Sequence, residues 1–129
     1  MSNKRLSIVI VDDNDMMRAI LRSILRGEAY EVIGEARNGA QAVEVVERLS
    51  PDIVCMDILM PEKNGLEAMA EIRQNMPETE FIMITSSAEP ETVQDAIANG
   101  ASGFIVKPFN AARVLDALKR TANRIQQRR

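Results

Sequence analysis

Short apolar segments alternate with longer segments of helical periodicity along the whole chain. Five runs rich in apolar and β-branched residues have the length of strands, at positions 6–11, 30–36, 52–56, 80–85 and 103–107. Three of these runs are continuously apolar rather than alternating, which is typical of strands covered on both faces. The pattern therefore predicts five strands, most of them buried.

The segments between the strands carry apolar residues at helical spacing. The first of them predicts an inward stripe made of Met17, Ile20, Leu21, Ile24 and Leu25. In the fourth, Pro90 suits the first position of a helix and Gly100 its end, and the residues expected to face inward are Val93, Ala96 and Ile97. Asn110 is expected to cap the fifth helix.

Five consecutive strand–helix units predict an α/β fold. Because a crossover of helical length joins parallel strands, we expect an open, doubly wound sheet of five parallel strands with five helices on its two faces. The 129 residues are enough for one domain and not for two.

Composition excludes several classes of function. A net charge of −3 and an aromatic content of 3% argue against nucleic-acid binding, and no apolar run is long enough to span a membrane. The single cysteine, Cys55, fits a reducing compartment, so we expect a cytoplasmic protein. The chain has no histidine, which excludes Ser-His and Cys-His nucleophile pairs and the commonest zinc sites.

Polar residues follow four of the predicted strands. Asp12 and Asp13 follow the first strand, Asp57 the third, Thr85 ends the fourth and Lys107 ends the fifth. A single acid after a strand is often only a helix cap. Five such residues delivered to the carboxyl edge of one parallel sheet, where ligands bind in doubly wound folds, predict a functional site.

Three carboxylates at one edge require a cation. Two like charges about 4 Å apart repel by about 4 kcal/mol at an effective dielectric of 20, and one lysine offsets only part of this repulsion. Oxygen ligands favour a hard ion, and Mg²⁺ fits best because it takes one or two carboxylates and keeps room for water and phosphate. A carboxylate beside Mg²⁺, an ammonium and a hydroxyl forms a site for phosphoryl transfer to the carboxylate itself.

Other phosphate-binding classes lack their motifs in this chain. Neither the P-loop pattern nor the dinucleotide-binding glycine pattern is present. A flavodoxin-type phosphate loop is disfavoured because Asp12 and Asp13 would repel the phosphate. A phosphatase of the haloacid dehalogenase kind needs a second aspartate two residues after its nucleophile, where this chain has Leu59.

Four stretches together resemble the receiver domains of two-component response regulators, most closely the stand-alone receivers of chemotaxis. They are VDDNDMMR, MDILMPEKNG, the Thr85–Ser86 step and GFIVKPF, in register with the five strand–helix units. The resemblance implies a flavodoxin-like sheet of order 2-1-3-4-5. It also implies that residues 1–129 form a single receiver domain with no output domain.

The resemblance assigns a phosphoacceptor and a metal site. Asp57 would accept a phosphoryl group from a histidine kinase. Mg²⁺ would be held by Asp13, Asp57 and the main-chain carbonyl of Leu59, with Asp12 joining through a water molecule. The protein would hydrolyse its own aspartyl phosphate slowly rather than turn over an external substrate, at a rate affected by Leu59 and Ser87.

The resemblance also implies a switch. Thr85 and Lys107 would contact phosphoryl oxygens, and the Lys107–Pro108 peptide bond would be cis. Phe104 would be the switch aromatic, with the small Ser86 leaving room for its ring to move inward.

Signalling would then depend on a partner surface around Val93, Phe104 and Val106. The expected partners are a sensor histidine kinase, a protein target such as a flagellar switch protein, and a possible phosphatase, with the receiver acting as a monomer. Three alternatives stay open: a receiver in a phosphorelay or with another kinase, the receiver fragment of a longer transcriptional regulator, and an interaction module that is never phosphorylated.

Overall fold

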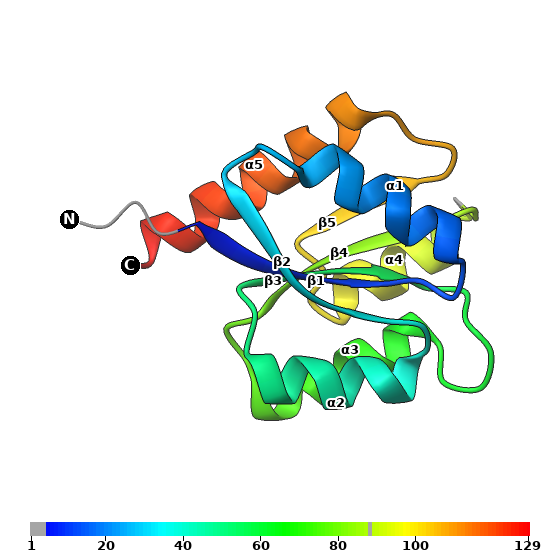
Figure 1. Cartoon of the computed structure of the whole chain (residues 1–129). Coiled ribbons are helices and arrows are strands. Elements are labelled where there is room, and N and C mark those ends of the chain that lie inside the picture. The colour runs from blue at the N-terminus through cyan, green and yellow to red at the C-terminus, as the bar shows by residue number, and fades with distance from the viewer. Residues whose placement is uncertain (1–4, 88) are drawn as a thin grey trace.

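The computed structural model describes residues 5–87 and 89–129, in which five strands alternate with five helices. The strands are β1 (Leu6–Val11), β2 (Tyr30–Ala36), β3 (Ile53–Asp57), β4 (Glu80–Thr85) and β5 (Gly103–Val106). The helices are α1 (Asp15–Leu25), α2 (Gly39–Leu49), α3 (Gly65–Asn75), α4 (Pro90–Ala98) and α5 (Ala111–Gln127) (Figure 1). Every predicted strand is confirmed to within one residue at each end.

The strands form one parallel sheet in the order β2-β1-β3-β4-β5. This confirms the predicted doubly wound fold. The chain moves outward from β1 to β2 and then returns to add β3 on the other side of β1. The strand order therefore reverses between β1 and β3, and ligands bind at the carboxyl ends of such a pair.

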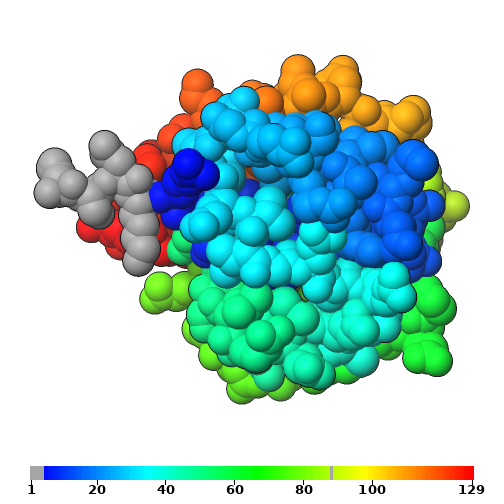
Figure 2. Space-filling model, in the orientation of Figure 1, coloured from blue at the N-terminus to red at the C-terminus, as the bar shows by residue number. Residues whose placement is uncertain are grey.

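Helices cover both faces of the sheet. One apolar core joins α1 and α5 to the sheet, and the other joins it to α2, α3 and α4 (Figure 1). Figure 2 shows the side where β2 lies between α1 and α2. Consecutive residues of a central strand enter opposite cores, as with Val54 and Cys55. Burial raises the pKa of the Cys55 thiol to about 12, so this cysteine is unreactive.

Asparagine begins four of the helices. Each side chain accepts a hydrogen bond from the main-chain N–H three residues later; the four caps are Asn14, Asn38, Asn64 and Asn110. Such a cap contributes about 1 kcal/mol relative to alanine. The cap at Asn110 was predicted, as was Pro90 at the start of α4. None of the helices in the described part of the chain combines the length and apolar character needed to cross a bilayer.

Two inward-facing residues were predicted wrongly. Ile20 is 40% exposed and Ile97 is 63% exposed. Helix α1 is buried along the narrow line of Leu21 and Leu25, and Ile20 lies about 100° around the helix from Leu21. Helix α4 buries only Ala96, so the neighbouring Ile97 faces outward. The apolar stripe predicted from helical spacing is therefore wider than the face that α1 or α4 buries against the sheet.

At the amino edge of the sheet, Asp52 joins β1, β3 and the end of α5. One of its oxygens accepts the Ser7 amide at 2.8 Å and the Ser7 hydroxyl at 3.1 Å, and the other accepts the Arg129 guanidinium at 2.7 Å. Burial acts to raise the pKa of Asp52, but these donors outweigh it and hold the pKa below its usual value.

We predict that Asp52→Asn destabilises the protein at pH 7 by about 1 kcal/mol, because a charged acceptor is lost. A lowered folded-state pKa gives stability above the unfolded value of about 4 that is lost as the pH falls through the folded value. Urea unfolding of the two proteins should therefore converge below about pH 4. Asp116→Asn, which breaks the exposed pair with Arg120, is the control and should change stability by less than about 0.5 kcal/mol. A difference that persists at pH 2 would contradict the assignment.

Candidate functional site

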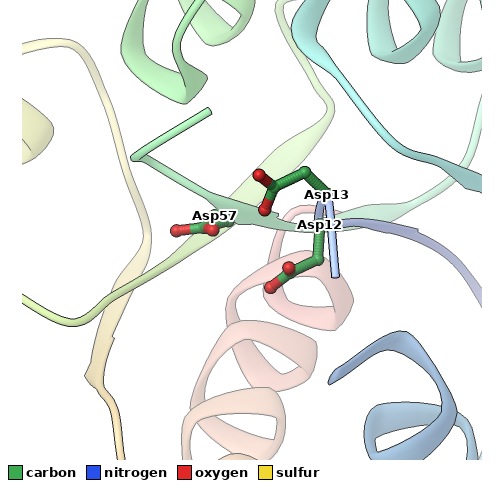
Figure 3. A group of neighbouring side chains, drawn as sticks. All are labelled: Asp12, Asp13 and Asp57. Atoms are coloured by element: carbon green, nitrogen blue, oxygen red, sulfur yellow. The ribbon is translucent and has the colours of Figure 1, made fainter. Parts of the chain in front are cut away.

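Three carboxylates converge at the point where the strand order reverses. Asp12 and Asp13 directly follow β1, and Asp57 is the last residue of the neighbouring β3. One oxygen from each lies within 4.8 Å of the others (Figure 3). Asp12 and Asp57 are buried, at 1% and 5% exposed, whereas Asp13 is exposed. The parallel register of β1 and β3 brings these acids together.

Lys107 directly follows the edge strand β5, and its side chain reaches the two buried acids, Asp12 and Asp57. Its Nζ lies 3.0 Å from Asp12 Oδ2 and 3.4 Å from Asp57 Oδ2. Its main-chain N–H donates to the Thr85 carbonyl at 2.8 Å, which ties the end of β5 to the end of β4. The Lys107–Pro108 peptide bond is cis. The lysine side chain is therefore held between two acids that belong to different strands.

The charges of the cluster are coupled. Burial raises the pKa of Asp57, Lys107 opposes that rise, and Asp12 adds to it, with a raised pKa as the outcome. Burial acts to lower the pKa of Lys107, but its contacts with Asp12 and Asp57 outweigh burial and raise it. Lys107 is thus an ammonium at neutral pH. Three carboxylates and one ammonium leave an excess of negative charge that a cation can neutralise.

The loop after β3 folds back over the phosphoacceptor candidate. The Leu59 main-chain N–H donates to Asp57 Oδ1 at 3.2 Å, while the Leu59 side chain is 54% exposed. This arrangement orients the Asp57 carboxylate and leaves the Leu59 side chain in solvent.

Thr85 and the predicted switch residues occupy the ends of β4 and β5. Thr85 is fully buried, and its hydroxyl accepts the Ser87 N–H at 3.2 Å. Among the described residues, no hydrogen bond joins that hydroxyl to the three acids. Phe104 is half-buried against the core beneath α2, α3 and α4, and Val106 on the same strand is 40% exposed. Val93 is half-buried on α4.

Gly65 is a site residue that the sequence did not single out. A Cβ at this position would lie 2.3 Å from the Asp57 carbonyl oxygen, so only glycine fits. Its N–H also donates to the Ile58 carbonyl at 2.8 Å. Gly65 therefore lets α3 begin directly against the end of β3. The available signal was its place in MDILMPEKNG, after the cap Asn64.

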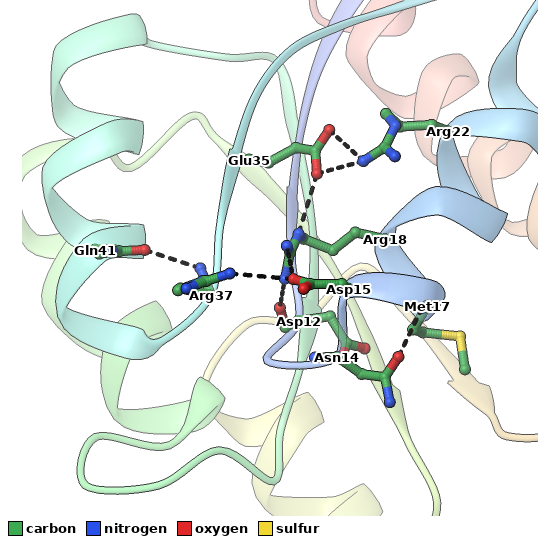
Figure 4. Close-up of polar contacts among 9 residues, drawn as sticks. All are labelled: Asp12, Asn14, Asp15, Met17, Arg18, Arg22, Glu35, Arg37 and Gln41. Carbon is green, nitrogen blue, oxygen red and sulfur yellow. Dashed lines mark hydrogen bonds and ion pairs between the residues drawn. The ribbon is translucent and has the colours of Figure 1, made fainter.

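Arg18 is the second residue that sequence reasoning missed. Its guanidinium donates to the main-chain carbonyl of Asp12 at 2.7 Å (Figure 4). Arg18 is the last residue of the stretch VDDNDMMR. Its contact is with a main-chain atom, which every residue type has, so the sequence does not predict this contact.

The donor set fits a hard divalent cation. The cluster offers carboxylate oxygens, and the chain has no histidine to attract a softer metal. Asp13 is exposed, so solvent reaches the cluster on the side of this residue. This suits Mg²⁺, which keeps several water ligands when bound to proteins.

Comparison with known proteins identifies the family. A family model described as the response regulator receiver domain matches residues 8–119. The chain belongs to the response regulator receiver family. Among curated relatives, this receiver is 48% identical to the chemotaxis protein CheY of Bacillus subtilis, over 90% of this chain and 97% of that protein. It is 45% identical to CheY of Thermotoga maritima, over 89% and 96% of the two chains.

Solved structures agree with the fold of the receiver. A chain in the crystal structure of the CheX–CheY–BeF3–Mg²⁺ complex of Borrelia burgdorferi superposes with a TM-score of 0.84 at 31% identity. The match covers 88% of this receiver and 86% of that chain.

We predict that Asp13→Asn stabilises the metal-free receiver by about 1 kcal/mol, because it relieves repulsion with Asp12 and Asp57 at a partly solvated site. Mg²⁺ should then stabilise the parent more than the variant, since a bound ion adds its binding free energy to folding. Urea unfolding in chelator and in Mg²⁺ measures both effects. Asp116→Asn is the control, because Asp116 pairs with Arg120 on α5, away from the three acids, and its loss relieves no repulsion among them. An Asp13→Asn variant that unfolds below the parent in chelator would make Asp13 a structural residue.

Proposed function

We propose that this receiver accepts a phosphoryl group on Asp57 from a histidine kinase and signals through a changed protein-binding surface. The observation that supports this most strongly is the environment of the Asp57 carboxylate. It is 5% exposed, held by the Leu59 N–H and the Lys107 ammonium, and grouped with two further acids. A carboxylate that is fixed and buried beside a cation suits a nucleophile better than a helix cap.

In this proposal Asp13, Asp57 and the main-chain carbonyl of Leu59 would hold Mg²⁺, and Asp12 would join through a water molecule. When bound, the metal supplies positive charge for the phosphoryl oxygens. This assignment agrees with the surplus of negative charge that Lys107 leaves uncompensated.

The chain's own residues account for the transfer step. A carboxylate oxygen of Asp57 forms the new bond to phosphorus, and the bond from phosphorus to the donor breaks with its electron pair leaving on the donor. The Lys107 ammonium and the Thr85 hydroxyl neutralise the phosphoryl oxygens. Lys107 is already within 3.4 Å of Asp57, so little reorganisation is needed.

Chemotaxis is the favoured pathway, with a flagellar switch protein as the target. Relatives named as the chemotaxis protein CheY are matched over 96–97% of their length at 45–48% identity. Such coverage favours a receiver of the same kind as these relatives. In this proposal, residues 1–129 form one receiver domain that acts as a monomer in the cytoplasm and binds its target directly. The aspartyl phosphate would be lost by slow self-hydrolysis or through a phosphatase partner.

We predict that acetyl phosphate with Mg²⁺ phosphorylates Asp57 without a kinase, because the site supplies the charge neutralisation that the transition state needs. Intact-mass analysis should show the addition of one phosphoryl group. Lys107→Met should slow the reaction by about 100-fold through loss of one stabilising donor.

Asp57→Asn is the matched control for that experiment and should take up nothing. Uptake of the group by this variant would show that the nucleophile is a different residue.

The proposed output is a movement of the Phe104 ring. A phosphoryl group on Asp57 would attract the Thr85 hydroxyl away from the Ser87 N–H that it now accepts. Thr85 pairs with Val106 across β4 and β5, and Phe104 lies two residues earlier on β5. The space given up by Thr85 would admit the ring, which is half-buried already. The partner surface around Val93, Phe104 and Val106 would change with it.

We predict that beryllofluoride with Mg²⁺ shifts the Phe104 ring inward, as followed by its aromatic NMR signals. Burying the rest of the ring gains about 1–2 kcal/mol, which shifts a two-state equilibrium about five- to thirtyfold and makes the switch graded. Phe104 and Phe109 both line a groove between β5 and α5, and Phe109 is also half-buried. The signals of Phe109 are the internal control and should not shift. An unchanged Phe104 environment combined with a rise in target affinity would show that the signal takes another route.

A further inference from the structure

The Arg18 guanidinium contacts the end of β1 at Asp12 and joins it to β2 and to the start of α1. Its side chain is 12% exposed. Nη1 donates to the Asp12 carbonyl at 2.7 Å, Nε donates to Glu35 of β2 at 3.1 Å, and Nη2 pairs with Asp15 of α1 (Figure 4). Each of the three guanidinium nitrogen atoms therefore has a hydrogen-bond partner.

The two carboxylates fix the direction of the third contact. Glu35 lies on β2 and accepts from Arg18 without depending on Arg22, although Arg22 Nη1 also lies 2.6 and 2.7 Å from its two oxygens. Asp15 also accepts from Arg37 at 3.1 Å. A guanidinium anchored on two sides in one plane aims its remaining N–H groups in a set direction. A lysine ammonium at position 18 would carry the same charge without this geometry.

The carbonyl that Arg18 holds belongs to the peptide unit between Asp12 and Asp13. That unit is planar, so fixing its oxygen fixes the directions in which the chain leaves toward both acids. The Asp12 N–H is held separately, by the Ala36 carbonyl at 3.1 Å. The Asp12 carboxylate in turn accepts the Asn14 N–H at 2.9 Å. The loop that carries the two acids is thus tied to β2 at one peptide and to Arg18 at the next.

We propose that Arg18 is a positioning residue for the cation site: it sets the peptide unit between Asp12 and Asp13 and so aims both carboxylates at Asp57. The proposal rests on the proposed function in taking Mg²⁺ as the ion. It differs from a charge effect, which lysine would preserve, and from a structural link between α1 and β2, which Arg22 also provides through Glu35.

The test compares Arg18→Lys with Arg22→Lys. Both variants keep the charge and lose a contact to Glu35, but only Arg18 touches Asp12. In the metal-free protein, amide exchange of Asn14 reports whether the Asp12 carboxylate stays in place, because that amide donates to it. We expect Asn14 exchange to accelerate about tenfold in Arg18→Lys and to stay within about twofold of the parent in Arg22→Lys. Mg²⁺ affinity, measured by titration calorimetry, should fall about tenfold in Arg18→Lys only.

Each outcome decides between the alternatives. The proposal would be overturned if Arg18→Lys kept the Asn14 exchange rate and the Mg²⁺ affinity of the parent. It would also be overturned if both variants changed equally in these two quantities and in proportion to their loss of stability in urea. If Arg18→Lys does not fold, Glu35→Gln provides the second test, because it loosens the guanidinium while leaving Arg18 present. It should accelerate Asn14 exchange by a smaller factor, and no acceleration would count against the proposal. A parent that binds no Mg²⁺ would refute the proposed function alone, since the exchange measurement needs no metal.

Discussion

Repulsion between carboxylates at the carboxyl edge of the sheet is the constraint on which the rest of this structure depends. Asp12 and Asp57 are nearly inaccessible to water, and the ammonium of Lys107 lies within 3.4 Å of both. Without the Lys107 ammonium, the two buried carboxylates would repel each other strongly. Because β1 and β3 are neighbours on either side of the reversal in strand order, the fold cannot carry these acids without bringing them together.

The surrounding elements hold this charged cluster in place by different means. The apolar side chains of β1, β3 and β4 fill the two cores, and this packing fixes the carboxyl ends of these strands. Gly65 lets α3 begin against the Asp57 carbonyl, and Arg18 holds the peptide that separates Asp12 from Asp13. The contact between Lys107 and Thr85 then connects the cluster to the end of β4 and to β5, the strand that carries Phe104 and Val106. In the proposed switch, chemistry at the acids would reach the protein surface through β4 and β5.

Most of the fold and the members of the acid cluster could be predicted from the sequence, because both depend on local patterns. Apolar runs mark the strands, and an acid at the end of a strand in a parallel sheet has its position set by topology alone. The predictions failed where a contact decides the outcome. Ile20 and Ile97 fit a helical stripe but face solvent, since α1 and α4 bury narrower lines than the template assumes. Arg18 acts on a main-chain carbonyl, and Gly65 acts through the absence of a side chain. Their places in VDDNDMMR and MDILMPEKNG could be read from the sequence, but these contacts could not.

We propose that the acid cluster is arranged to place a phosphoryl group on Asp57 beside a divalent cation and Lys107. A crystal structure of the chain with Mg²⁺ and beryllofluoride tests it most directly. We expect beryllofluoride on the Asp57 carboxylate, Mg²⁺ in contact with Asp13 and Asp57, and the Lys107 ammonium moved from Asp12 toward a fluorine. Beryllofluoride bound at another residue, or Mg²⁺ bound away from the three acids, would contradict it.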